Sequence, residues 1–326
     1  MRRLPNLHFL LLILSAFTCT ERLKVTRIKL AHGLDITHPV HRGMVYLSER
    51  VSEMSEGNMM IDIYPSQQLG TERQCLELLQ IGSLGMTKVS AAVLENFAPD
   101  LKVLGIPYIF RDIDHAHQVY DGPIGRDLLV EGEKYWLKGL CFYDAGSRSF
   151  YTKNKPVLNP DDLKGLKIRV QESVTAMNMI KNLGGAPTPI SWGELYTALQ
   201  QGVVDGAENN PPSFYTSRHY EICGYYSLNE HTTIPDVLLI STIVWDTLSE
   251  KEKDMLEAAV KESVYFQRKV WYEEEQYALQ QVVDAGVQIF YPDKEPFMER
   301  TREMQEAYSD DESLMQFIYR INETGK

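Results

Sequence analysis

The sequence predicts an α/β protein whose two lobes face each other across a cleft. Three observations indicate this. Residues 26–90 alternate between strand and helix patterns, a second alternating set begins near residue 146, and residues 250–285 have the pattern of one long helix. Alternating strands and helices favour mostly parallel sheets with helices on their faces. Because the chain has no Gly-rich dinucleotide loop, we expect the ligand site in a cleft between the lobes.

The first set has the order strand, helix, strand, helix, strand. Pro39 suits the first turn of the first helix, and Gly57 follows its end. Pro65 stops the second strand, because proline cannot donate a backbone hydrogen bond. The pattern predicts strands at 26–31, 59–64 and 86–90, and helices at 39–55 and 69–80.

The second set begins with two strand-like segments and a helix that stops at Gly184 and Gly185. Asn210 precedes two prolines, which is typical of a helix start. The pattern predicts strands or extended segments at 147–152, 167–170, 186–189 and 203–207, and helices at 173–182, at 192–200 and after Asn210.

A single long helix is predicted at 250–285, a segment with no internal proline or glycine. Ser249 and Glu252 form a capping box, and Gly286 suits the C-terminal end. At 1.5 Å per residue, about 36 residues span about 54 Å, which exceeds one lobe. We therefore expect the helix to lie across both lobes. The alternative is two helices with a break near Arg268.

The N-terminus has the features of a signal peptide over residues 1–18. Arg2 and Arg3 precede an apolar run at 9–14 that is too short to span a bilayer. Cys19 then stands where a lipobox has its lipidated cysteine, although Phe17 and Thr18 are larger than usual there. We expect an extracytoplasmic protein, either tethered to the membrane through lipidation of Cys19 or freely secreted.

Charge and composition exclude several classes of function. The formal net charge is −12, and it becomes about −14 once residues 1–18 are removed, so a nucleic-acid partner is not expected. Cys75, Cys141 and Cys223 lie far apart and are expected to pack as small hydrophobic residues, with a disulfide between two of them left open.

No motif for a metal, a cofactor or a common catalytic centre is present. We expect a binding protein and not an enzyme. The rival enzyme hypothesis is a lyase that uses His38 or His231 as its base.

Arg169 is the strongest candidate for a ligand contact. It ends the strand-like run 165–170 and precedes a predicted helix, which is where open α/β folds place their sites. Its planar guanidinium group matches a carboxylate through two parallel charge-assisted hydrogen bonds.

Other candidates surround the same predicted cleft. Arg148 stands at the crossover into the second set, beside small residues. Trp192 offers a flat face to a sugar ring, and Asn209 and Asn210 offer donors and acceptors to hydroxyl groups. Glu72 begins its helix, where the alternative role is a favourable charge on the helix dipole.

Four segments that occur in order resemble the DctP family, the extracytoplasmic solute-binding subunits of tripartite ATP-independent periplasmic (TRAP) transporters. They cover the mature chain and are Tyr64-Pro65-Ser66-Gln67-Gln68-Leu69-Gly70, Gly165-Leu166-Lys167-Ile168-Arg169-Val170, Ala186-Pro187-Thr188-Pro189 and Asp205-Gly206-Ala207-Glu208-Asn209. The resemblance implies a periplasmic-binding-protein fold with two lobes, a hinge and a long helix spanning both. It places lobe I at 24–145 plus 235–274 and lobe II at 146–234 plus 275–326.

The resemblance also implies that Arg169 clamps a ligand carboxylate. Arg148, Trp192 and Asn209 match positions that bind ligand in sialic-acid-binding members. Ala207 replaces a glutamine of their motif, and Ser90 replaces an acidic residue, which argues against sialic acid. The pattern is closer to members that take hexuronates such as D-glucuronate or D-galacturonate.

A hexuronate has one carboxylate for Arg169 and several hydroxyl groups. Expected partners of the hydroxyl groups are Glu72, His32, His38, Asn209, Asn210 and His231. The runner-up ligand is a C4-dicarboxylate or another small organic acid, with Arg148 as the second cation. The expected protein partners are the small and large membrane subunits of a TRAP transporter. A sensor that presents its ligand to a membrane receptor is the alternative.

Overall fold

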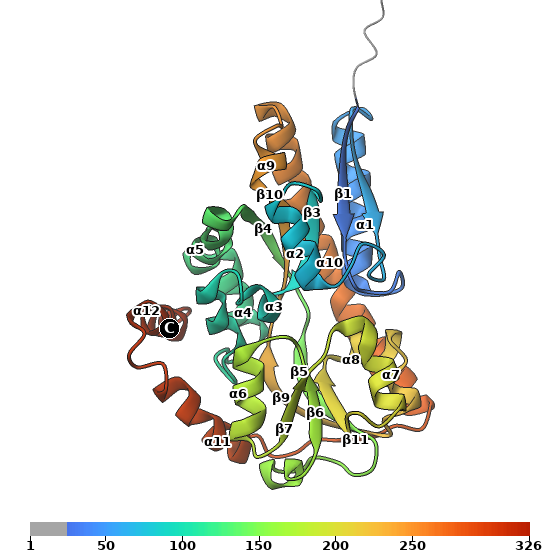
Figure 1. The fold of residues 1–326 in the computed structure, drawn as a ribbon, viewed down its shortest axis with the longest axis vertical. Coiled ribbons are helices and arrows are strands. Elements are labelled where there is room, and N and C mark those ends of the chain that lie inside the picture. Colours follow the sequence, from blue (N-terminus) through green and yellow to red (C-terminus); the bar gives the residue numbers. More distant parts are fainter. Residues whose placement is uncertain (1–24) are drawn as a thin grey trace, which may run out of the picture.

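The computed structural model describes residues 25–326 and contains two sheets, one in each lobe. The predicted signal peptide and the predicted lipidation site Cys19 lie outside the described residues. Figure 1 shows the lobes one above the other, with the first sheet in the upper half and the second in the lower half. The two-lobed α/β fold is therefore confirmed.

The first sheet combines parallel and antiparallel strands. Its order is β2 (Met59–Tyr64), β1 (Thr26–Ala31), β3 (Met86–Ser90), β10 (Asp236–Ser241) and β4 (Leu137–Tyr143). The first three strands are parallel, as predicted, whereas β10 runs antiparallel to both of its neighbours. Successive residues of β10 pack in two different core clusters, so both faces of this sheet are buried.

The second sheet has the order β11 (Gln288–Phe290), β9 (Tyr225–Thr233), β5 (Ser147–Thr152), β8 (Gly206–Asn209), β6 (Lys167–Val170) and β7 (Ala186–Pro189). It is also covered on two sides, because neighbouring residues Phe150 and Tyr151 of β5 belong to different core clusters. The strands β6 and β8, which carry Arg169 and Asn209, are parallel neighbours. The sheet thus brings two distant predicted site segments together.

Helices cover both sheets and end close to their predicted positions. Those of the first lobe are α1 (Pro39–Met54), α2 (Glu72–Gln80), α3 (Ala91–Leu94), α4 (Ile113–Asp121), α5 (Pro123–Glu131) and α9 (Thr242–Trp245). Those of the second lobe are α6 (Val174–Asn182), α7 (Leu195–Gln200), α8 (Pro211–Thr216) and α11 (Glu295–Glu306). Short 3-10 helices occur at Pro99–Gly105, Gly132–Tyr135, Pro160–Leu163, Trp192–Glu194 and His219–Glu221.

Helix α12 (Glu312–Glu323) corrects one detail of the predicted division into lobes. The sequence assigns it to lobe II, but its apolar face packs into a core cluster of the first lobe through Leu314, Ile318 and Ile321. Helix α12 is amphipathic, and these three side chains share its apolar face, which must be buried against a core. The other lobe boundaries stay a prediction.

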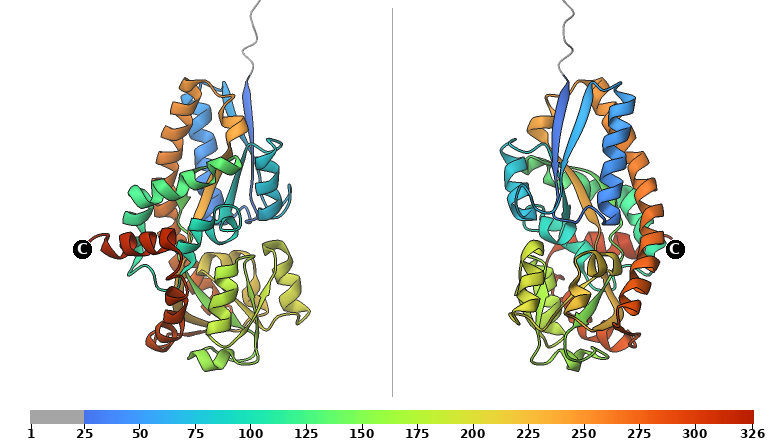
Figure 2. Two further views of the ribbon diagram at one scale, coloured as in Figure 1. Left: turned by 60° about the vertical axis from the view of Figure 1, so that its left-hand side comes forward. Right: turned by 90° about the vertical axis from the view of Figure 1, so that its right-hand side faces the viewer.

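The long helix α10 (Glu250–Asp284) is continuous, as predicted, and begins with the expected capping box at Ser249. It packs against α1 and β4 of the first lobe and against α8 of the second. Figure 2 shows it running beside both lobes. It therefore braces the two halves of the molecule.

Two strand connections cross between the lobes beside α10, from β4 to β5 and from β9 to β10. At the first crossing, the side-chain amide of Gln267 donates to the carbonyl of Asp144 and accepts from its backbone N–H, each at 2.9 Å. Gly146 has a φ of +56°, and an added Cβ would lie 2.8–3.0 Å from Glu275 and Trp271 of the same helix. The crossing is thus tied tightly to the middle of α10.

Candidate functional site

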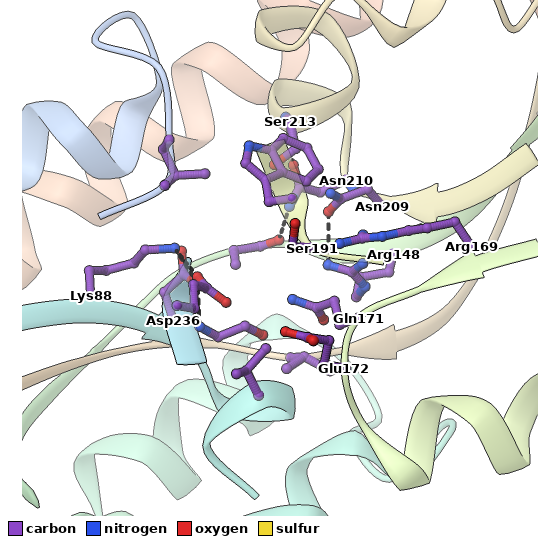
Figure 3. Close-up of a pocket in the computed structure, with 18 of the residues that line it drawn as sticks. Lys88, Arg148, Arg169, Gln171, Glu172, Ser191, Asn209, Asn210, Ser213 and Asp236 are labelled. Carbon is purple, nitrogen blue, oxygen red and sulfur yellow. Dashed lines mark hydrogen bonds and ion pairs between the residues drawn. The ribbon is translucent and has the colours of Figure 1, made fainter. Parts of the chain in front are cut away.

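A pocket lies between the lobes and is lined by residues of both. Figure 3 shows side chains from both lobes pointing toward it. It brings together seven of the ten predicted ligand contacts, namely Glu72, Ser90, Arg148, Arg169, Trp192, Asn209 and Asn210. Among the polar and charged residues that line it, the sequence reasoning missed Lys88, Gln171, Glu172, Ser191, Ser213 and Asp236.

Arg169 is buried in the pocket wall with part of its charge unmatched. Its Nε donates to the carbonyl oxygen of Ile190 at 2.9 Å, and its guanidinium carbon lies 5.8 Å from the centre of the Trp192 ring. Its buried Nη1 has no hydrogen-bond partner in the described part of the chain. Burial lowers the pKa of Arg169 from its usual value, which reflects the cost of holding this cation away from water. An anion in the pocket would offset that cost.

Arg148 lines the same wall, but protein groups already satisfy it. Its Nη2 donates to Oε1 of Glu208 at 2.8 Å and to the carbonyl oxygen of Glu208 at 2.8 Å. Its Nη1 donates to Asn209 at 2.8 Å. Burial opposes ionisation of Glu208, but the charge of Arg148 and the nearby ring of His231, 3.5 Å away, outweigh it and hold the pKa of Glu208 at about 2. The Arg148–Glu208 pair is therefore a neutral unit.

The opposite wall carries a buried cluster of Glu72, Lys88 and Asp236. Lys88 Nζ lies 3.2 Å from Oε1 of Glu72 and 3.0 Å from Oδ1 of Asp236. The backbone N–H of Ser90 also donates to Oε1 of Glu72, at 3.2 Å. Burial opposes the charge of Lys88, but the carboxylates of Asp236 and Glu72 outweigh it and raise its pKa. Lys88 therefore stays a cation between two acidic groups.

Hydrogen-bonding capacity remains in the middle of the pocket. The side-chain oxygen of Gln171 is buried and has no partner in the described part of the chain. Asn210 is held by its own bonds to the carbonyl oxygen of Ala145 and the N–H of Ser213, at 2.7 and 2.8 Å. The pocket thus offers both a free acceptor and fixed amide groups, which suits a hydroxyl-rich ligand.

The structure does not place His32, His38 or His231 at the pocket wall, although the sequence predicts all three as ligand contacts. The ring of His32 is bonded to His41 at 3.0 Å, and that of His38 to Ser213 at 3.1 Å. His231 is buried behind the wall and stacks on Phe150. Burial lowers the pKa of His32 to about 2, so it stays neutral. The physical reason for the correction is that neighbouring side chains hold at least one ring nitrogen of each histidine inside the fold, away from the pocket wall.

The lobes also contact each other beside the pocket. Glu95 follows α3 in the first lobe, and its Oε1 accepts from Oγ of Ser173 at 2.8 Å and from N–H of Thr175 at 3.0 Å. Asn96 donates to the carbonyl oxygen of Glu172 at 2.7 Å. A carboxylate of one lobe therefore caps the N-terminus of α6 in the other, a position that the helix dipole favours.

The described residues show no cluster of side chains that could hold a metal ion. Cys75, Cys141 and Cys223 are free and buried, which removes the disulfide left open by the sequence. Within residues 25–326, no helix is both long and apolar enough to cross a membrane.

Comparison with known proteins gives this architecture a family. The model of the bacterial extracellular solute-binding proteins of family 7, DctP, matches residues 30–311. The chain belongs to the DctP family. Its relatives include the uncharacterised protein YiiZ of Salmonella typhimurium, 35% identical over 91% of each chain. They also include the C4-dicarboxylate-binding periplasmic protein DctP of Rhodobacter capsulatus, 32% identical over 81% of this chain and 79% of that protein.

Solved structures of TRAP periplasmic solute-binding proteins share the fold of this DctP-family chain. One from a Bradyrhizobium species, in complex with D-galacturonate, is 39% identical with a TM-score of 0.89, over 91% of this chain and all of that chain. One from Anaerococcus prevotii with bound D-glucuronate is 35% identical, with a TM-score of 0.89 over 91% and 97%. One from Polaromonas with bound D-erythronate is 32% identical, with a TM-score of 0.89 over 92% and 99%. Membership of this family supports an extracytoplasmic location and a role in solute binding for transport.

Proposed function

We propose that this protein captures a hexuronate, of the D-galacturonate or D-glucuronate type, in the pocket between its lobes. The observation that carries the proposal is the buried Nη1 of Arg169, which has no partner in the described part of the chain. The ligand carboxylate would accept hydrogen bonds from this guanidinium group. Three similar solved structures hold sugar acids, which supports the same ligand class here.

The charge arrangement favours this ligand over a C4-dicarboxylate. The runner-up hypothesis needs Arg148 as a second free cation, but Glu208 and Asn209 already occupy its guanidinium group. Lys88 is matched by two carboxylates. Arg169 is thus the cation that remains for one carboxylate, while Gln171, Asn210 and the acidic groups suit hydroxyl groups.

Closure of the lobes would complete the capture. In an open form, water would solvate Arg169 and Glu95. On closure, the ligand carboxylate and Arg169 would lie in a medium of lower dielectric constant, where their attraction is stronger. The closed protein would then deliver its ligand to the small and large membrane subunits of a TRAP transporter, driven by an ion gradient. A lipid on Cys19 would tether the protein to the membrane.

Binding to protein freed of ligand by refolding tests the proposal. In a thermal-shift assay, D-galacturonate or D-glucuronate should raise the melting temperature, whereas succinate and glucose should not, because a ligand that binds only the folded state stabilises it. A shift with succinate alone would overturn the sugar-acid assignment.

Substitution of the proposed carboxylate partner provides the residue-level test. Arg169→Ala should weaken uronate binding by about 2–5 kcal/mol in calorimetry, because the carboxylate would be buried without its partner. Arg302→Ala is the matched control, since Arg302 is exposed on α11. Equal affinities for Arg169→Ala and the control would exclude the clamp.

A further inference from the structure

The two walls of the pocket carry different charged groups. The second-lobe wall has Arg169 and Glu172 beside the neutral Arg148–Glu208 pair, and the first-lobe wall has Glu72, Lys88 and Asp236. Figure 3 shows Arg148 and Arg169 on one side and Lys88 with Asp236 on the other. The first pair lies on β5 and β6 of the second lobe, and the other two residues lie on β3 and β10 of the first. A ligand whose carboxylate sits on Arg169 would therefore direct its far end toward Lys88 and Asp236.

The first-lobe wall carries an excess of negative charge. Glu72 and Asp236 contribute two carboxylates, and Lys88 contributes one ammonium group between them. The side chains of Lys88 and Asp236 are only 2% and 9% exposed, so water screens their charges weakly. A second carboxylate brought to this wall would meet like charge in a desolvated place.

Each carboxylate of this wall keeps one oxygen available. Lys88 binds Oε1 of Glu72 and Oδ1 of Asp236, and Ser90 also uses Oε1 of Glu72. Within residues 25–326, no hydrogen bond or ion pair engages the other oxygen of either group. Ionised carboxylates only accept hydrogen bonds, and hydroxyl groups donate them.

We propose that Glu72, Lys88 and Asp236 select the charge state of the ligand's far end. This cluster accepts a neutral, hydroxylated end and rejects a second carboxylate. The protein therefore takes sugar acids with one carboxylate and excludes aldarates, the sugar acids oxidised at both ends. The inference rests on the proposed function, because it needs the first carboxylate to lie on Arg169.

A pair of open-chain acids isolates the charge effect. D-Galactonate and galactarate have the same carbon chain and differ at one end, where a CH₂OH group is replaced by a carboxylate. Ring shape is therefore not a variable in the comparison, and D-galacturonate serves as the reference ligand. The bound D-erythronate of the Polaromonas structure supports the use of an open-chain acid as probe.

Calorimetry on the wild-type mature protein should show galactarate binding at least about 100-fold more weakly than D-galactonate. In Asp236→Asn, this ratio should fall by about 10-fold or more, because one repelling charge is lost while the side chain keeps its shape. Asp254→Asn, at an exposed position of α10, is the control and should keep the wild-type ratio.

A second variant guards against loss of folding. If Asp236→Asn does not fold, Glu72→Gln replaces it, since Asp236 then still pairs with Lys88. Equal binding of the two acids by the wild type, or an unchanged ratio in the variant that folds, would overturn the charge-selection inference alone. Failure of the wild type to bind D-galacturonate, D-galactonate and galactarate would overturn the proposed function, and this inference with it.

Discussion

The contact of Glu95 with α6 should hold the lobes together around the ligand. Glu95 belongs to the first lobe, and it accepts from Ser173 and Thr175 at the start of a helix in the second. It is buried and does not line the pocket. Its removal therefore tests closure without removing a ligand contact.

The size of the effect follows from the two hydrogen bonds. A hydrogen bond to a charged group contributes about 1.5–3 kcal/mol, but in an open form water would replace part of both bonds. We expect Glu95→Ala to weaken binding by about 2 kcal/mol, which is about 30-fold in Kd. Because the contact forms on closure, the dissociation rate should rise and the association rate should change little.

Calorimetry with D-galacturonate gives the affinity, and stopped-flow displacement gives the dissociation rate. Glu299→Ala is the matched control, because Glu299 is exposed on α11. If Glu95→Ala bound uronate as tightly as this control, closure would not depend on the capped helix and the reasoning would fail. A change confined to the association rate would also contradict it.

Two further predictions concern buried charges near the crossings. Burial, followed by the charges of Glu230 and Asp144, raises the pKa of Glu275 to about 7. Between pH 4.5 and 7 the folded protein then binds more protons than the unfolded chain, so this group lowers stability as pH rises. Glu275→Gln should therefore raise the melting temperature by a few degrees at pH 8 and leave it unchanged at pH 4; equal shifts at both would contradict the assignment. Arg148→Ala should cost about 3–5 kcal/mol in urea unfolding, because it leaves Glu208 buried without its cation; a cost below about 1 kcal/mol would refute a buried pair.

Local sequence patterns predicted the fold well at helix starts, where a capping side chain marks the first turn. The helices that begin after Ser249 and Asn210 start where expected, because capping side chains satisfy their first N–H groups. The placement of β10 between β3 and β4 was not predictable in this way. The apolar residues of β10 predict a buried strand. Which strands lie beside it, and in which direction it runs, depend on strands that are far away in the sequence. The segment that forms α12 was assigned to lobe II, although it packs on the first lobe, for the same reason.

The site was predicted best on the second-lobe wall. Arg169 and Asn209 lie at strand ends, where ligand sites are expected. Lys88 and Asp236 were missed because each belongs to a fully buried strand, and their meeting depends on the antiparallel pairing of β10 with β3. A lysine inside a buried strand was the available signal, since a buried lysine needs acidic partners. His32, His38 and His231 were predicted at the pocket wall because residue type alone does not reveal that each ring is held by a neighbouring side chain inside the fold.

The position of β10 also governs when the first lobe can fold. In its sheet β10 separates β3 from β4, yet in the chain it follows nearly the whole second lobe. A chain that emerges from its N-terminus can form β1, β2 and β3, but the gap between β3 and β4 stays open until residues 236–241 arrive. Such long-range pairing folds slowly, because loop closure precedes the stabilising contacts. The first lobe therefore completes its sheet only after most of the second lobe has been synthesised.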